Sequence, residues 1–396
     1  MSFVDAQNKF YNALCEGLGL SRQTFQIIQP SPPLIPGDNR FLWNYFNNIP
    51  VFSLTQNYIA SGGNQLFSDY SGLMSALRPA EPIDLAADIG EQTLSDFQTY
   101  VRTTFTPAPT ANQYPDIFFN WALTNAPNVA NIGAGDFATL VLDPIGAAQT
   151  ALMPYQPTRG PHPAPGLAPD WALGYDQLVE QMRGAPAMSF TMASNTTSST
   201  VTDTWSGGSN SGFFGLFGSG DSTNKQTSDF AASNFSVQAS FGHVLTFQTN
   251  AGLWYTSSAM GAAYSDHDSP PWRPDGVIQW DNTFGPNGNI QRVMASLVAV
   301  DTMHVVVTAS TSYDENDKTT INHQSSGGLW PFYNASNGNG MTTKYSFSDG
   351  GAITITIDSA PGVPIVIGGN VLPIGQFVGH AVTAFERLRS RALANR

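Results

Sequence analysis

The strongest constraint on the fold of this chain is a long hairpin-like segment that occurs twice. The first copy spans residues 188–247 and the second spans 303–367. Their first residues are 115 positions apart, and so are their aromatic tips. Each copy runs from a strand-like stretch through polar residues to the tip, and then into a second strand-like stretch. This regular spacing indicates a duplicated supersecondary unit.

The return run of the first copy predicts the type of sheet. Phe235–Phe247 alternates apolar and polar residues, a period of two that is typical of a strand with one buried face. Parallel strands need helical crossovers, for which the repeat has no pattern, so we expect antiparallel pairing. A two-sheet sandwich or a strongly twisted, barrel-like sheet satisfies these constraints. His243 falls on the apolar face and is expected to be a hydrogen-bonded core imidazole.

The remaining chain has the 3.6-residue period of helices, so we predict an α+β fold. Six prolines between Pro154 and Pro169 indicate a linker. Asp170 is the expected N-cap of the helix that follows it. The predicted segments are a helical region at 1–153, a Pro-rich linker at 154–169, a connecting helix at 170–185, a duplicated, sandwich-like antiparallel β domain at 186–374, and a basic C-terminal helix at 375–396 that packs back on the helical region.

Charge and composition exclude several classes of function. A net charge of −13 and just four lysines argue against nucleic acid as a partner, because phosphate binding needs clustered cations. Apolar runs are far shorter than the roughly 18–20 residues of a membrane-spanning helix. The first residues lack a secretory signal, so we expect cytoplasmic synthesis, with release by another route left open. The single Cys15 excludes an internal disulfide and predicts a small buried hydrophobe. No cofactor is expected.

Two aromatic tips within polar surroundings are the best candidates for a functional surface. The first tip contains Phe213, Phe214, Leu216 and Phe217, and the second contains Leu329, Trp330, Phe332 and Tyr333. Burying each such side chain is worth about 1.5–3 kcal/mol, so something must cover the tips. Three covers are open: the protein's own sheet or helices, a neighbouring subunit, or a membrane interface.

The preferred function follows from the tips. We expect a non-enzymatic interaction protein whose two long hairpins present the tips to a membrane interface or to another copy of the chain. A self-assembling, toxin-like component would have this organisation, although the arm at 193–204 lacks the apolar alternation of a lipid-facing strand.

The alternative function is an enzyme or small-molecule binder with its pocket between the helical and β halves. Asp266, His267 and Asp268 form the densest titratable cluster, and two carboxylates beside an imidazole can hold a divalent metal. Nucleophile-elbow, phosphate-loop and zinc-protease motifs are absent from the sequence. The acidic stretch from Asp314 to Asp317 lacks the order of a calcium loop and is expected to be solvated.

Overall fold

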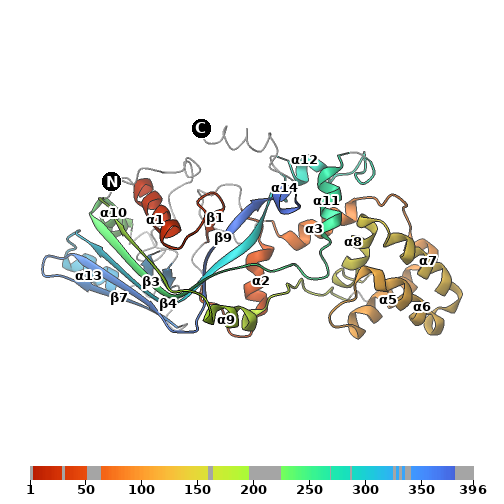
Figure 1. Cartoon of the computed structure of the whole chain (residues 1–396), viewed down its shortest axis with the longest axis horizontal. Helices are drawn as coiled ribbons and strands as arrows, with labels where there is room; N and C mark the ends of the chain where they lie inside the picture. The colour runs from red at the N-terminus through yellow and green to blue at the C-terminus, as the bar shows by residue number, and fades with distance from the viewer. Residues whose placement is uncertain are drawn as a thin grey trace.

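The computed structural model of the chain is elongated, with a twisted sheet towards one end and a group of helices at the other (Figure 1). Its helices and antiparallel strands give the α+β fold predicted from the sequence. The structure describes residues 3–28, 32–50, 64–158, 164–195, 224–267, 269–285, 288–323, 327–329, 332–334 and 340–379.

The helices lie along the sheet, at its far end, in a separate group and between the sheet and that group. The α-helices in chain order are α1 (Phe3–Gly17), α2 (Asn39–Asn47), α3 (Leu66–Ala76), α4 (Leu85–Ile89), α5 (Glu91–Thr104), α6 (Tyr114–Asn125), α7 (Ala130–Leu140), α8 (Pro144–Leu152), α9 (Tyr175–Arg183), α10 (Asn224–Ala232), α11 (Ser257–Ser265), α12 (Trp280–Thr283), α13 (Glu315–Asn322) and α14 (Ile374–Phe377). Helix α1 lies along the sheet, α10 and α13 lie at its far end, and α4 to α7 form a separate group that we call the lobe (Figure 1). Asp38, Asp84 and Asp143 begin α2, α4 and α8, where each carboxylate accepts backbone N–H groups that have no partner within the helix.

Seven strands form one antiparallel sheet, and two short strands pair separately. The strands are β1 (Phe25–Ile27), β2 (Met188–Ala193), β3 (Phe235–Phe247), β4 (Arg292–Ala309), β5 (Gly327–Leu329), β6 (Phe332–Asn334), β7 (Met341–Phe347), β8 (Ile353–Ser359) and β9 (Ile365–Pro373). The order is β1-β9-β4-β3-β2, with β8 on β4 and β7 on β8, while β5 pairs with β6.

The long strand β4 explains why there is one main sheet rather than the predicted sandwich of two. Its 18 residues pair with β3 along one side. Along the other side, the first half pairs with β9 and the second half with β8. Because β4 pairs with β3 of the first repeat and with β8 of the second, the strands of both repeats share a single ladder and cannot separate into two stacked layers. The twisted-sheet alternative is the one that the structure shows.

The duplicated hairpin is present, and its two copies have the same register. Ser189 pairs with Ser240 across β2 and β3, and His304 pairs with Asp358 across β4 and β8. The second pair follows from the first by the 115-residue and 118-residue offsets that relate the two repeats. The two hairpins are neighbours in the sheet, because β3 of the first pairs with β4 of the second.

A local distortion changes which face of the sheet is buried. Thr302 has φ of 48° and lies opposite Gly242, where an added Cβ would come within 2.7 Å of the Thr302 Cβ. On one side of this pair, Phe241 and Met303 face the core beneath α1. On the other side of the pair, the residues that face this core have even numbers instead of odd ones, in both strands. They include Val244 and Val300. The first half of β4 is therefore buried on both faces.

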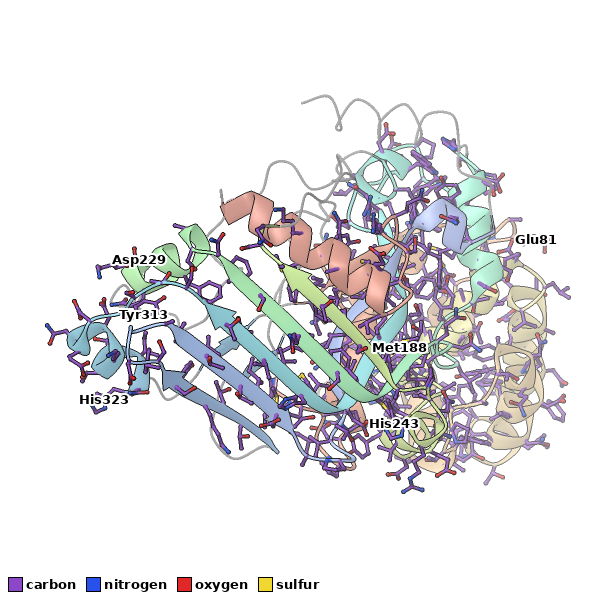
Figure 2. The ribbon with its side chains drawn as sticks, turned by 60° about the vertical axis from the view of Figure 1, so that its left-hand side comes forward. Glu81, Met188, Asp229, His243, Tyr313 and His323 are labelled. Atoms are coloured by element: carbon purple, nitrogen blue, oxygen red, sulfur yellow. The ribbon has the colours of Figure 1, made fainter. Side chains whose placement is uncertain are left out.

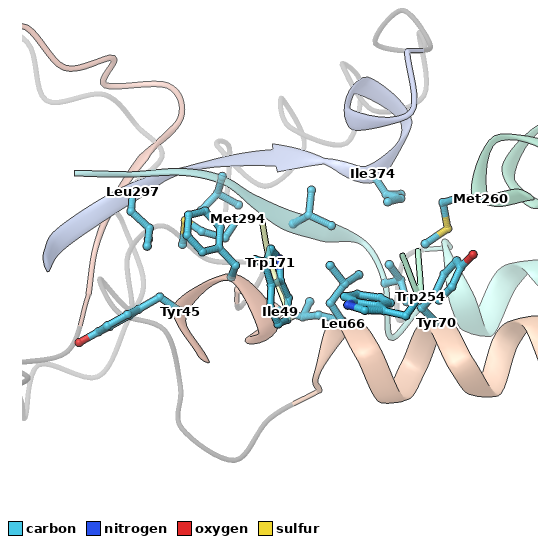
Figure 3. Packing of buried hydrophobic residues seen from close by; sticks show 14 of the residues in the cluster. Tyr45, Ile49, Leu66, Tyr70, Trp171, Trp254, Met260, Met294, Leu297 and Ile374 are labelled. Atoms are coloured by element: carbon cyan, nitrogen blue, oxygen red, sulfur yellow. The ribbon is translucent and has the colours of Figure 1, made fainter. Parts of the chain in front are cut away.

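Three cores hold the molecule together. The sheet core lies between α1 and the sheet and includes Phe10, Phe190 and Val305. The body core lies on the opposite face of β4, around the fully buried Trp254 and the rings of Tyr70 and Trp171 (Figure 3). The lobe has a small aromatic core of its own, centred on Phe97, Phe118 and Phe137.

Several predicted boundaries differ in the structure. β1 lies within the predicted helical region and pairs with β9, because its three residues are fully buried against that strand. The described parts of the predicted linker, 154–158 and 164–169, are packed: Leu167 N–H donates to Pro154 C=O, and Tyr155 is buried. Helix α9 begins after Gly174 rather than Asp170, whose carboxylate accepts from Tyr155 OH and whose C=O accepts from Trp254 Nε1–H and Gly252 N–H. The predicted basic helix lies outside the described residues from 380 onward.

Candidate functional site

The two hairpin connections leave the sheet from one continuous row of residues. Ser194 N–H donates to Phe235 C=O, and Ser310 N–H donates to Asn234 C=O, which places the start and end of the first connection beside the start of the second. The connections are residues 194–234 and 310–352, 41 and 43 residues long. Their described helices, α10 and α13, meet at the far end of the sheet, where Figure 2 shows Asp229 and Tyr313 near each other.

A group of polar contacts, which we call the latch, joins the two connections. Asp317 of α13 accepts from Lys225 Nζ at 2.9 Å and from Gln226 Nε2 at 2.8 Å, both on α10. Tyr313 OH donates to Gln226 C=O at 2.8 Å. The hydrogen bond from the Lys225 ammonium lowers the pKa of the Asp317 carboxyl below its usual range. The expectation that this acidic stretch is solvated is therefore wrong for Asp317, because its partners come from a segment about 90 residues away in sequence.

Phe332, one of the residues predicted to contact a membrane or partner, is buried in the structure. Its side chain is fully buried in the sheet core, with its ring centroid 5.5 Å from that of Phe241 and 6.3 Å from that of Phe10. The short hairpin of β5 and β6 thus folds back onto the sheet, and the protein itself covers this residue. Phe332 is not available to a membrane or a partner in this arrangement.

The other tip residues remain predictions. Phe213, Phe214, Leu216, Phe217 and Trp330 lie outside the described residues. For Leu329 and Tyr333 the structure describes the backbone, which belongs to β5 and β6.

The predicted metal cluster has limited support. Asp266 and His267 are exposed in the loop after α11, and Asp268 lies outside the described residues. The His267 ring stacks on Trp280 with centroids 4.3 Å apart. Within the described ranges, no three His, Cys, Asp or Glu side chains converge in a way that could hold a metal ion.

Sequence reasoning missed two histidine–aspartate pairs on the sheet. His243 Nδ1 lies 2.7 Å from Asp301 Oδ1, and His304 Nδ1 lies 2.6 Å from Asp358 Oδ1. The parity change at Gly242 takes His243 out of the sheet core, so the predicted core imidazole is instead one-third exposed. Within the described residues, neither imidazole is hydrogen-bonded to a hydroxyl or thiol that could act as a nucleophile. Each pair is formed by two residues directly opposite each other on neighbouring strands. Only the strand register reveals such pairs, and the sequence alone does not give the register.

A cleft of about 1060 Å³ separates the lobe from the rest of the molecule. Residues of α4 and α5 form one part of its lining, residues 77–79, 269 and 273–277 form another part that we call the second wall, and α8 contributes Gln149 and Thr150. Residues 77–79 belong to the predicted helical region, and residues 269–277 form a loop of the predicted β domain. The two segments are joined by a hydrogen bond from Arg78 N–H to Pro271 C=O at 2.8 Å. Most of the residues that line the cleft thus belong to the predicted helical region, and most of the others come from the loop at 269–277 of the predicted β domain.

No family model, curated protein or solved structure matches this chain. In the described part of the chain, every helix is too short or too polar to cross a bilayer.

Proposed function

We propose that this is a non-enzymatic interaction protein that acts by extending its two hairpin connections and bringing their aromatic tips to a membrane interface. One observation carries the proposal. Strands β2, β3, β4 and β8 are neighbours in that order, and both connections leave from the same row at their ends. Extending both connections as hairpins would prolong these four strands, and it would require β7, which lies within the second connection, to detach from β8.

The lengths of the connections support this extension. Each has about 20 residues per arm, which at about 3.3 Å per residue corresponds to roughly 65 Å. In the described structure they are instead folded back, with Phe332 in the sheet core and α10 joined to α13 by the latch. Release of the connections would expose Phe332. The folded-back form thus keeps part of the apolar surface covered until release.

The chemistry of the tips indicates which kind of surface they would meet. Trp, Tyr and Phe are enriched where a membrane meets water, because their rings are apolar and some carry a polar group. The net charge of −13 opposes binding to anionic lipids. We therefore expect zwitterionic vesicles to bind more tightly than anionic ones at low salt, and the difference to shrink as salt screens the repulsion.

The test is flotation with zwitterionic vesicles. Phe214→Asp combined with Trp330→Asp should abolish vesicle binding while leaving the thermal transition largely unchanged. A matched control, Leu142→Asp with Leu123→Asp, removes two exposed apolar residues remote from the hairpins and should bind as the parent does. Equal loss in both variants, or no loss in the tip variant, refutes the proposal. A tip variant that unfolds shows that the tips belong to the core.

The same tip variant distinguishes a membrane from another copy of the chain. If it loses self-association in lipid-free solution and the parent protein does not bind vesicles, the hairpins contact neighbouring subunits instead. Sedimentation velocity of both proteins without lipid provides this measurement.

A further inference from the structure

The cleft between the lobe and the body contains two cations that have no ionic partner. Arg78 and Arg273 both line it, and neither forms an ion pair with any described residue. The backbone bond from Arg78 to Pro271 brings these arginines, 195 positions apart in sequence, onto the same wall. This is notable in a chain where 29 acidic side chains outnumber 16 basic ones. Both side chains are exposed at the cleft, and a guanidinium group offers fork-shaped donors to a carboxylate or sulfonate.

Apolar side chains form much of the remaining lining. Leu94 of α5 and Met153, which follows α8, line the cleft together with Leu77. Val277 lies in the loop of the second wall and is 91% exposed, the highest value among the exposed large apolar residues. An apolar group left in water beside a cleft is stabilised when a ligand covers it. The lining therefore suits a ligand with an apolar body as well as an anionic group.

Carboxylates in the lining restrict the charge of the ligand. Glu91 and Asp275 line the cleft, and neither is within ion-pair distance of an arginine. Asp84 also lines it, but its carboxylate is occupied by Ala87 N–H at the start of α4. These carboxylates would repel each additional negative charge on a ligand. A monoanion is thus favoured over a phosphorylated or polycarboxylic compound.

We propose that the cleft binds a monoanionic amphiphile, with the carboxylate or sulfonate at Arg78 and Arg273 and the apolar body against Leu94, Met153 and Val277. Its location between two separately packed cores is common for ligand sites, and its volume is at the upper end of their range. This activity is independent of the hairpins, because none of the lining residues belongs to the hairpin connections.

The experiment uses the full chain, with decanoate as the probe and decanol as its uncharged counterpart, each displacing fluorescent anilinonaphthalene sulfonate. Arg78→Gln with Arg273→Gln should weaken decanoate binding at least about tenfold and change decanol binding less than about twofold, because each charge-assisted bond contributes to the anion alone. Arg40→Gln with Arg183→Gln, two arginines outside the cleft, should leave both affinities unchanged. Unchanged decanoate affinity in the cleft variant, or equal losses for the two ligands, overturns the proposal.

Two further measurements separate this site from the hairpins and test its selectivity. Val277→Glu, at an exposed position where folding is not at stake, should also weaken decanoate binding. The hairpin variant Phe214→Asp with Trp330→Asp should retain it, and loss of binding in that variant assigns the probe to the tips. If citrate displaces the fluorophore as effectively as decanoate does, the selectivity for a monoanion is refuted.

Discussion

Replacing Phe332 with alanine tests whether the second hairpin connection is held to the sheet by this side chain. The residue is fully buried, and its ring lies near the rings of Phe10, Phe190 and Phe241. Full burial of a phenylalanine is worth about 1.5–3 kcal/mol, and each favourable ring pair adds about 0.5–1.5 kcal/mol. With the cavity that remains, Phe332→Ala should cost about 3–5 kcal/mol.

The cost should appear first as local opening of β5 and β6. These strands have three residues each and are not part of the main sheet, so they can detach while β3 and β4 stay paired. Native-state hydrogen exchange should show amides of 327–334 losing protection in the variant while the centre of β4 keeps it. Urea unfolding of the whole chain should show a smaller loss if local opening precedes it. Under the proposed function, the same variant should bind vesicles more readily, since a contact that holds the folded-back form is gone.

The matched control is Phe377→Ala at the end of the described chain. Phe377 is 39% exposed, and its ring lies 6.4 Å from that of Tyr255. Its truncation should cost less than about 1.5 kcal/mol. If Phe332→Ala costs less than about 1 kcal/mol and leaves exchange at 327–334 unchanged, Phe332 does not anchor the connection and the folded-back argument is wrong.

Three other predictions follow from the sheet, the latch and the cysteine. Gly242→Ala should destabilise the protein by about 1–3 kcal/mol in urea titrations, because the new Cβ would clash with Thr302. Adding Thr302→Gly should recover most of the lost stability. If it recovers none, the clash is refuted. Asp317 has a lowered pKa in the folded state, so its contribution to stability is present above its unfolded pKa, about 4, and is lost as pH falls through the folded value. Asp317→Asn should therefore melt at a lower temperature than the parent at neutral pH, with the difference shrinking in acid; a constant difference would contradict this. Burial raises the pKa of the Cys15 thiol to about 12, so aromatic disulfide reagents should label it only as the chain unfolds; fast labelling of the native protein would show that the thiol is accessible.

The local patterns of the sequence predicted the strands better than their assembly. Alternation in Phe235–Phe247 predicted β3, and the equal spacing of the two copies predicted two hairpins whose registers agree. The number of sheets was not predictable, because it depends on the length of β4 and on its two partners along one side. The alternation of apolar and polar residues continues in the sequence across Gly242. In the structure, the residues that face the sheet core change there from odd to even numbers, at the point where Thr302 has a positive φ.

The candidate sites divide in the same way. The aromatic tips were visible as apolar residues in polar surroundings, yet the burial of Phe332 depends on a return of the chain that local pattern does not encode. The latch and the cleft were not visible, since Lys225 and Asp317, like Arg78 and Arg273, are far apart in sequence.

By itself, the sequence determined the α+β class, the antiparallel pairing within each repeat and the acidic character of the surface. These properties arise from residue periodicity, spacing and charge, which are local or summed quantities. The tertiary structure alone decided that the two hairpins share one ladder, that Phe332 is buried, and which polar side chains meet at the latch and the cleft. Such contacts depend on the register and direction of segments distant in sequence, and a one-residue change of register would move every side chain of a strand to the other face.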